Sequence, residues 1–158
     1  MTPLWREVPG IWPDAHRMAR VALRLLAALL VGSVIGLQRQ QSHKPAGLRT
    51  HLLVALGTAL LVVSVVEADF KSADISRVIQ GLITGIGFLG GGTILKLTQA
   101  QEIRGLTTAA GIWLTAAASV AAGLGEFAAA FIAVIFALIV LTVVGRLEAG
   151  RAERRDGE

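Results

Sequence analysis

Five long apolar runs fill most of this chain of 158 residues, and they constrain its fold more than any other feature. A membrane-spanning helix needs about 20 mostly apolar residues, because each residue adds about 1.5 Å toward a hydrocarbon core of about 30 Å. All five runs approach that length, and they cover residues 21–37, 48–66, 78–97, 106–124 and 127–145. The sequence therefore predicts an all-α, polytopic membrane protein with about five transmembrane helices.

The main alternative is a water-soluble helical bundle, whose outer faces would need polar residues at every turn. The run 127–145 offers only Thr142 as a polar residue, and the run 106–124 offers only threonines, Ser119 and the amphipathic Trp113. Neither helix could face water. The first run is a poor signal peptide, because it lacks a small-residue cleavage site and four further runs follow it.

Composition narrows the function classes further. The chain has no cysteine, which excludes disulfides, Cys-ligated zinc, iron–sulfur clusters and thiol nucleophiles. Its net charge of +4 does not indicate nucleic acid, because Lys and Arg occur in short clusters between apolar runs, with few aromatic residues among them. We expect no cofactor and no nucleic acid; the expected partner is the lipid bilayer, and a further copy of the chain is a candidate partner.

The distribution of Lys and Arg predicts the orientation, because cytoplasmic loops carry an excess of these residues. With five spans, one side collects nine basic residues and the other collects six. The nine are Arg39, Lys44, Arg49, Lys96, Arg104, Arg146, Arg151, Arg154 and Arg155, and the six are Arg6, Arg17, Arg20, Arg24, Lys71 and Arg77. We therefore expect an irregular or interfacial segment outside (1–20), a transmembrane domain (21–145) and a short cytosolic tail (146–158).

Glycine, with 18 copies, is the most informative residue, because small residues let helix backbones approach one another in a bilayer. The candidate packing residues are Gly32, Gly36, Gly81, Gly85, Gly87, Gly90, Gly91 and Gly92. In the third run they fall on two nearly opposite stripes, which predicts a helix at the centre of the bundle or at a helix–helix interface. Alternatively, the sequence Gly90-Gly91-Gly92 unwinds the helix and offers carbonyl oxygens to a cation, as broken helices do in transporters.

Two connections on the expected cytosolic side echo each other, since both read Gly-Leu-x-Thr where a span begins, at 47–50 and 105–108. Each places hydroxyl groups and free backbone N–H groups at a helix start, where the helix dipole is positive. With basic residues nearby, the two starts could form a pocket for an anionic headgroup, a phosphate or a partner's carboxylate. The candidate residues are Arg39, Lys44, Arg49, Thr50, His51, Arg104, Thr107 and Thr108.

Plain N-capping together with the positive-inside orientation explains the same residues without a ligand. The echo also suggests two related helical hairpins, formed by spans one with two and three with four, plus a fifth helix.

Ion transport and hydrolysis find little support in the residues. Mg²⁺ prefers carboxylate and carbonyl oxygens, and no Asp or Glu lies well inside any run. An intramembrane hydrolase needs a nucleophile with a base within reach, yet Ser33 lies in a helix-packing sequence and His51 begins the next run. Arg24 is the one charge within a span, and snorkelling to the interface explains it. We predict no metal site and no enzyme activity.

Five motifs occur in order along the chain, namely RLL (24–26), GLQR (36–39), KPAGLRTH (44–51), GIGFLGGG (85–92) and RGLTTAA (104–110) with Trp113. Together they resemble the MgtC/SapB family of bacterial inner-membrane proteins. The resemblance implies about five spans and a link to growth at low magnesium and to survival of pathogens inside macrophages. It further implies regulation of membrane potential and ATP level through the membrane sector of the ATP synthase.

Two features depart from the family pattern. Where the family usually has an acid before the arginine that follows span one, this chain has Gln38 before Arg39, and Gln40 replaces a second common acid. We also expect the cytosolic C-terminal domain of the longer members to be absent. The prediction is a regulator that acts by helix and cytosolic-face contacts with a membrane partner. The alternative is a transporter or channel for Mg²⁺ or another cation through the third run.

Overall fold

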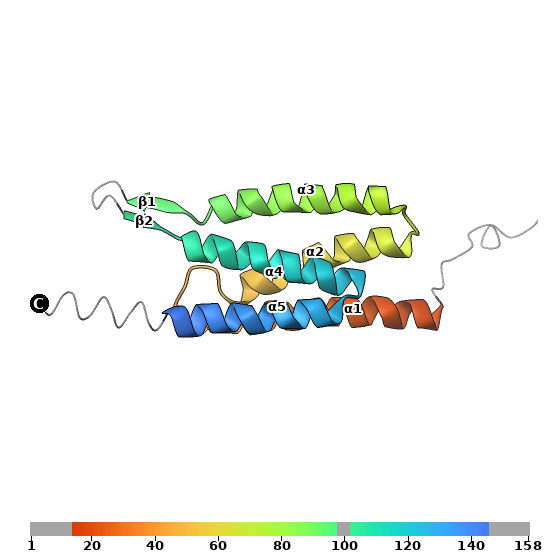
Figure 1. Cartoon of the computed structure of the whole chain (residues 1–158), viewed down its shortest axis with the longest axis horizontal. Coiled ribbons are helices and arrows are strands. Elements are labelled where there is room, and N and C mark those ends of the chain that lie inside the picture. The colour runs from red at the N-terminus through yellow and green to blue at the C-terminus, as the bar shows by residue number, and fades with distance from the viewer. Residues whose placement is uncertain (1–13, 98–101, 146–158) are drawn as a thin grey trace, which may run out of the picture.

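The computed structural model describes residues 14–97 and 102–145, which form five helices lying side by side and one small hairpin (Figure 1). The helices are α1 (Ala15–Gln41), α2 (Leu48–Glu67), α3 (Ser72–Gly91), α4 (Leu106–Leu124) and α5 (Phe127–Ile139), and α5 continues into the π-helix η2 (Val140–Val144). Between α3 and α4, the strands β1 (Leu95–Leu97) and β2 (Glu102–Arg104) pair antiparallel. The first 13 residues of the expected N-terminal segment and the expected tail 146–158 lie outside the described residues.

Successive helices run in opposite directions, so α1 begins at one end of the bundle and η2 finishes at the other (Figure 1). The end that carries β1, β2 and the α1–α2 loop is termed the hairpin end. Four described segments are long and apolar enough to cross a membrane, namely α1, α2, α4 and Phe127–Val144. α3 is less apolar because its first turns contain Asp74, Arg77 and Gln80, although it lies along the same bundle. The all-α membrane fold is therefore confirmed.

The third apolar run does not form one continuous helix. α3 ends at Gly91 with Gly92 as its C-cap, and the rest of the run turns into β1. The carbonyl of Gly90 accepts hydrogen bonds from the backbone N–H of Thr93, at 3.0 Å, and from its hydroxyl, at 2.8 Å. The three glycines thus terminate the helix, and the Gly90 carbonyl is used within the chain.

The turn from β2 into α4 requires glycine at position 105. Gly105 has a φ of +96°, a left-handed conformation that side chains disfavour. A Cβ at this position would also overlap the carbonyl oxygen of Thr93. The hairpin is thereby held against the chain that leaves α3, which fixes where α4 starts.

Small residues form the core where α1, α2 and α4 meet. Gly32 and Gly36 of α1 lie against the start of α2, and a Cβ on Gly32 would come within 2.7 Å of the His51 carbonyl oxygen. Gly123 of α4 is equally close to Val62 of α2. The backbones therefore approach at these points because no side chain intervenes. The alanines without exposed surface in this core are Ala28, Ala55, Ala59 and Ala122.

α3 lies at the edge of the bundle, so of its two expected places the centre differs from the structure and the helix–helix interface agrees with it (Figure 1). It packs mainly against α4, and only Ile86 and Gly90 are buried on it. A Cβ on Gly90 would make ordinary contact with Ala109, at 3.6 Å. Glycine spacing marks a surface suited to close packing, but it does not say what covers that surface. The glycines of α3 with open space around an added Cβ are Gly81, Gly85, Gly87 and Gly91.

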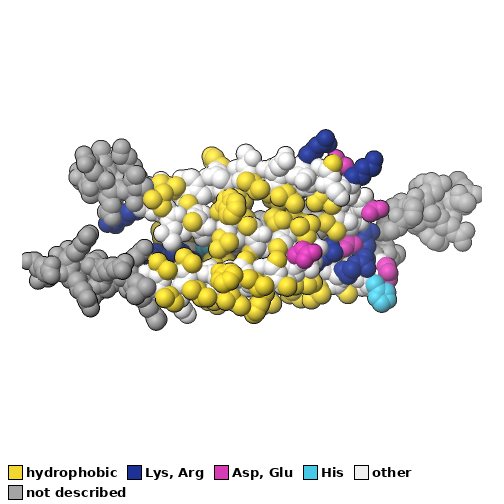
Figure 2. Space-filling view, in the orientation of Figure 1, with side chains coloured by type: hydrophobic (Ala, Val, Ile, Leu, Met, Phe, Trp, Pro, Cys, Tyr) yellow, Lys and Arg dark blue, Asp and Glu magenta, His cyan; other side chains and the backbone are white. Residues whose placement is uncertain are grey.

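Large apolar side chains cover the outside of the bundle. Leu53 of α2 is 71% exposed and Phe88 of α3 is 84% exposed. Figure 2 shows hydrophobic side chains across the middle of the visible face, with charged side chains gathered at the end away from the hairpin. An apolar surface of this extent suits contact with lipid rather than water.

A cluster of three arginines around one carboxylate ties α1 to α2 at the end away from the hairpin. Arg17, Arg20 and Arg24 lie on one face of α1, and each contacts the carboxylate of Glu67 at 3.2–3.4 Å. Residues 15–20, expected to be irregular, are therefore the first turns of α1. Arg24 pairs with Glu67 instead of merely reaching the interface.

Candidate functional site

A polar cluster is buried between α1, α2 and α4, and it extends from the hairpin end past the middle of α4. Soluble cores seldom bury such groups without partners, and in a membrane protein they are functional candidates. All its members are at most 3% exposed. The polar cluster consists of Arg39, His51, Thr108, Thr115 and Ser119.

Arg39 connects the last turn of α1 to the first turn of α4. Its Nη2 donates a hydrogen bond to Oγ1 of Thr108 at 2.8 Å, and both residues are 3% exposed. The Nε–H of Arg39 is buried and has no hydrogen-bond partner. The guanidinium keeps its charge in a protein, so this bond holds a positive charge inside the helix bundle.

His51 connects α2 to α4. Its Nδ1 lies 2.8 Å from Oγ1 of Thr115, whose hydroxyl donates to the carbonyl of Gly111 at 2.9 Å. A hydroxyl has one proton, so Nδ1–H donates to Thr115 when the threonine proton goes to Gly111. Nε2 of His51 is buried and has no partner. Ser119, one turn further, donates to the carbonyl of Thr115.

Glycines make the space that the imidazole occupies. A Cβ on Gly36 would lie 3.1 Å from the Cβ of His51, and a Cβ on Gly111 would lie 3.7 Å from its Cε1. The His51 ring therefore sits between α1 and α4 where both helices lack side chains. Three helices are positioned by this one residue.

The structure divides the eight candidate residues into two groups. Arg39, His51 and Thr108 are buried and belong to the polar cluster. The other five are exposed. They are Lys44, Arg49, Thr50, Arg104 and Thr107.

The helix starts are not capped by the hydroxyls, which corrects the plain N-capping interpretation. The N-caps of α2 and α4 are Gly47 and Gly105, neither of which has a side chain to offer. The N–H of Leu48 is instead accepted by Oε1 of Gln40, at 3.4 Å. Thr108 accepts a hydrogen bond from Arg39 and is therefore free of a capping role.

Gln38, which replaces a common family acid, links α1 to η2. Its Nε2 donates to Oγ of Ser42 at 3.2 Å and to the carbonyl of Leu141 at 3.4 Å. Its Oε1 is buried without a partner. The amide thus uses its donor side, which a carboxylate lacks.

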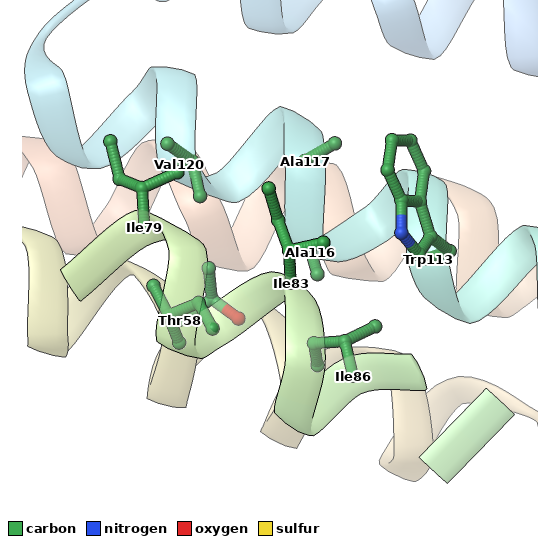
Figure 3. A pocket seen from close by; sticks show the side chains of 9 residues that line it. Thr58, Ile79, Ile83, Ile86, Trp113, Ala116, Ala117 and Val120 are labelled. Atoms are coloured by element: carbon green, nitrogen blue, oxygen red, sulfur yellow. The ribbon is translucent and has the colours of Figure 1, made fainter. Parts of the chain in front are cut away.

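An apolar pocket of about 150 Å³ separates α3 from α2 and α4. In Figure 3, isoleucines of α3 face Trp113 and the alanines of α4, with Thr58 of α2 also lining the space.

Ser33, considered as a nucleophile, donates instead to the carbonyl of Leu29 in its own helix. In residues 14–97 and 102–145, no three His, Asp or Glu side chains converge as a metal site.

Comparison with known proteins identifies the family. Residues 25–149 match the sequence profile of the MgtC family. This chain belongs to the MgtC family. Protein SrpB of Synechococcus elongatus is 42% identical over 139 residues, which are 81% of this chain and 76% of SrpB. The Escherichia coli K12 protein named "Putative magnesium transporter YhiD" is 38% identical over 136 residues, 82% of this chain and 62% of YhiD.

Protein MgtC of Salmonella typhimurium is 42% identical over 116 residues, which are 73% of this chain and 48% of MgtC. The chain thus spans about half the length of this relative and under two thirds of YhiD. No solved structure matches the chain.

Sequence reasoning missed two members of the polar cluster in this MgtC-family protein. Thr115 lies seven residues after Thr108 and four after Gly111, so all three share one face of α4. Ser119 continues that face by another turn. The signal was therefore present as a polar and glycine stripe along an otherwise apolar helix.

Proposed function

We propose that this chain is a regulatory protein of the bacterial inner membrane that acts by contact with a membrane partner. The regulation concerns growth under magnesium limitation, membrane potential and ATP level. The candidate partner is the membrane sector of the ATP synthase. Family membership supports the link to magnesium, since one relative carries that metal in its name.

The observation that carries the proposal is the combination of a buried anchor and an exposed basic surface at the hairpin end. The polar cluster fixes how the ends of three helices are arranged there, through the Arg39–Thr108 and His51–Thr115 bonds. Exposed basic residues, among them Arg49, lie on the same helix ends. A rigid cationic surface favours encounter with an acidic surface on a partner protein.

In this proposal the hairpin end faces the cytosol, because basic loop residues collect there. The N-terminus then lies outside and the C-terminus inside. A reporter enzyme that works only in the cytosol should be active when it is fused after Glu158. Activity of a reporter that works only outside the cytosol would place the basic surface away from the partner and refute the proposal.

Inverted membrane vesicles test the regulatory role directly. ATP synthesis should change when vesicles contain the protein, while proteoliposomes that contain the purified protein and a Mg²⁺-sensitive dye should show no protein-dependent flux. Protein-dependent Mg²⁺ uptake without a change in ATP synthesis would overturn the proposal.

Two exposed arginines at opposite ends of the bundle provide matched variants. Arg49→Ala should weaken the effect on ATP synthesis with little loss of protein from the membrane, because Arg49 is exposed at the hairpin end. Arg77→Ala, at the other end, should leave the effect unchanged. If Arg49→Ala lowers the amount of protein in the membrane as much as it lowers the effect on ATP synthesis, Arg49 is structural and not part of a contact surface.

A second candidate function, transport of Mg²⁺, is favoured by the printed name of YhiD. The route would pass along the glycine-rich end of α3. Against this route stands the carbonyl of Gly90, which already accepts two hydrogen bonds from Thr93. The flux measurement above decides between the two candidates.

A further inference from the structure

Arg39 is a buried cation without a counter-ion among the side chains that the structure describes. It is 3% exposed, and its hydrogen bond to Thr108 goes to a neutral hydroxyl. The described ion pairs within 4 Å do not include it. Its Nε–H is buried and unpartnered. Because burying an unpaired charge and an unpaired donor is costly, this position favours an anion.

The surroundings of Arg39 add to the positive potential. α2 starts at Leu48 and α4 starts at Leu106, so the positive ends of two helix dipoles lie at the hairpin end. Both helix starts would stabilise a negative charge beside the guanidinium.

We propose that Arg39 binds a phosphate group at the hairpin end, with Thr108 holding the guanidinium in position. A guanidinium presents its N–H donors in a planar fork that matches the oxygens of a phosphate. Nη2 donates to Thr108, and the buried Nε–H has no partner. Arg39 is three residues from the end of α1, where a spanning helix reaches the depth of lipid headgroups.

The phosphate comes either from an anionic phospholipid or from free phosphate, since both present the same oxygens to the guanidinium. The inference deepens the proposed function and rests on it for the cellular role of the hairpin end. A bound phosphate would make the contact surface responsive to lipid composition or to phosphate level.

Titration of the full-length protein in detergent tests the site. The probes are dioctanoyl-phosphatidylglycerol, dioctanoyl-phosphatidylcholine, and inorganic phosphate, with chloride at matched ionic strength. The readouts are the Nε–H resonances of ¹⁵N-labelled arginine and the midpoint of thermal unfolding, which a ligand of the folded state raises. We expect one arginine resonance to shift saturably with phosphatidylglycerol or inorganic phosphate, and not with chloride.

The two phosphate probes identify the source. A response to phosphatidylglycerol alone assigns the lipid, and a response to inorganic phosphate at comparable concentration assigns the free ion. The inference would be overturned if neither phosphatidylglycerol nor inorganic phosphate gave a saturable response. An equal response to chloride would also overturn it.

Variants place the response at Arg39. Arg39→Lys keeps the charge but loses the fork, and it should weaken binding by at least about tenfold. Arg77→Lys, an exposed position at the other end of the bundle, should bind as the wild type does. If Arg39→Lys does not fold, Thr108→Val keeps the arginine but releases it, and should weaken binding as well. Unchanged binding in either Arg39→Lys or Thr108→Val would refute the assignment.

The binding experiment contains no partner protein, so its outcome is separable from that of the vesicle experiment. Phosphate binding without an effect on ATP synthesis would refute only the regulatory role. An effect on ATP synthesis without phosphate binding would refute only the present inference.

Discussion

His51 of α2 and Thr115 of α4 are joined by a buried hydrogen bond of 2.8 Å across 64 residues of sequence. On the other side of the same histidine lies Gly36 of α1, whose lack of a side chain leaves room for it. One side chain without exposed surface therefore sets the relative positions of three helices.

Thr115→Val should destabilise the fold by about 1–3 kcal/mol, because it leaves Nδ1 of His51 buried without a partner. Thr142→Val is the matched control, since its hydroxyl donates only to the carbonyl of Leu138 in its own helix. Thermal unfolding in detergent, followed by circular dichroism, should give the lower midpoint for Thr115→Val. Equal midpoints would show that the His51–Thr115 bond does not stabilise the bundle.

Gly32→Leu and Gly91→Leu should have opposite outcomes. At Gly32 an added Cβ would already lie 2.7 Å from a backbone oxygen of α2, so a leucine should prevent the close approach of α1 and α2. At Gly91 nothing lies within 4 Å of an added Cβ, so the same change should leave the fold intact. The yield of monodisperse protein in size-exclusion chromatography checks both variants.

The glycine spacing around Gly91 suggests a different outcome. If Gly91 were a packing residue, a larger side chain would push packed helices apart. A loss of folded protein in Gly91→Leu would contradict the open space seen at α3. An altered oligomer size with unchanged folding would assign that face of α3 to a contact between copies.

Glu67→Gln should lower the midpoint of thermal unfolding, because it leaves Arg17, Arg20 and Arg24 facing one another without a carboxylate. Arg24 is only 16% exposed, so its interaction is less screened than those of the other two arginines. Asp74→Asn removes an exposed pair with Arg77 and should change the midpoint little. Equal effects of the two variants would mean that the arginine cluster adds nothing to stability.

Gln38→Glu restores the acid that the family usually has, yet it should destabilise this particular chain. The carboxylate cannot donate to the carbonyl of Leu141, which Gln38 now contacts, whereas the hydroxyl of Ser42 can turn and donate to it. The loss is about 1 kcal/mol for the bond to Leu141, with further repulsion between the carboxylate and that carbonyl. A higher unfolding midpoint for Gln38→Glu would show that the amide contacts are dispensable.

The helices themselves could be predicted from the sequence because apolar runs of fixed length identify spans. The runs 48–66 and 106–124 coincide closely with α2 (Leu48–Glu67) and α4 (Leu106–Leu124). The place of α3 could not be predicted, because in a membrane an apolar face suits lipid as well as another helix. The glycines at 90–92 nevertheless explain why the helix ends before the run 78–97 does.

The candidate site could be predicted only in part. The basic and hydroxyl residues near the two Gly-Leu-x-Thr segments included Arg39, His51 and Thr108, all members of the polar cluster. Which of them are buried depends on contacts such as Arg39 with Thr108, 69 residues apart, which local patterns do not reveal. Thr115 was missed because a threonine within an apolar helix commonly bonds to its own backbone, and here it does so while also accepting from His51.

The edge position of α3 has a consequence for biosynthesis. The ribosome releases α3 before α4, yet within the chain α3 packs mainly against α4 and only weakly against α2. A newly inserted α3 therefore has to wait in the bilayer, with its charged first turns and bare glycines uncovered, until translation delivers its neighbour. During that interval lipid covers the face of α3 that α4 later covers.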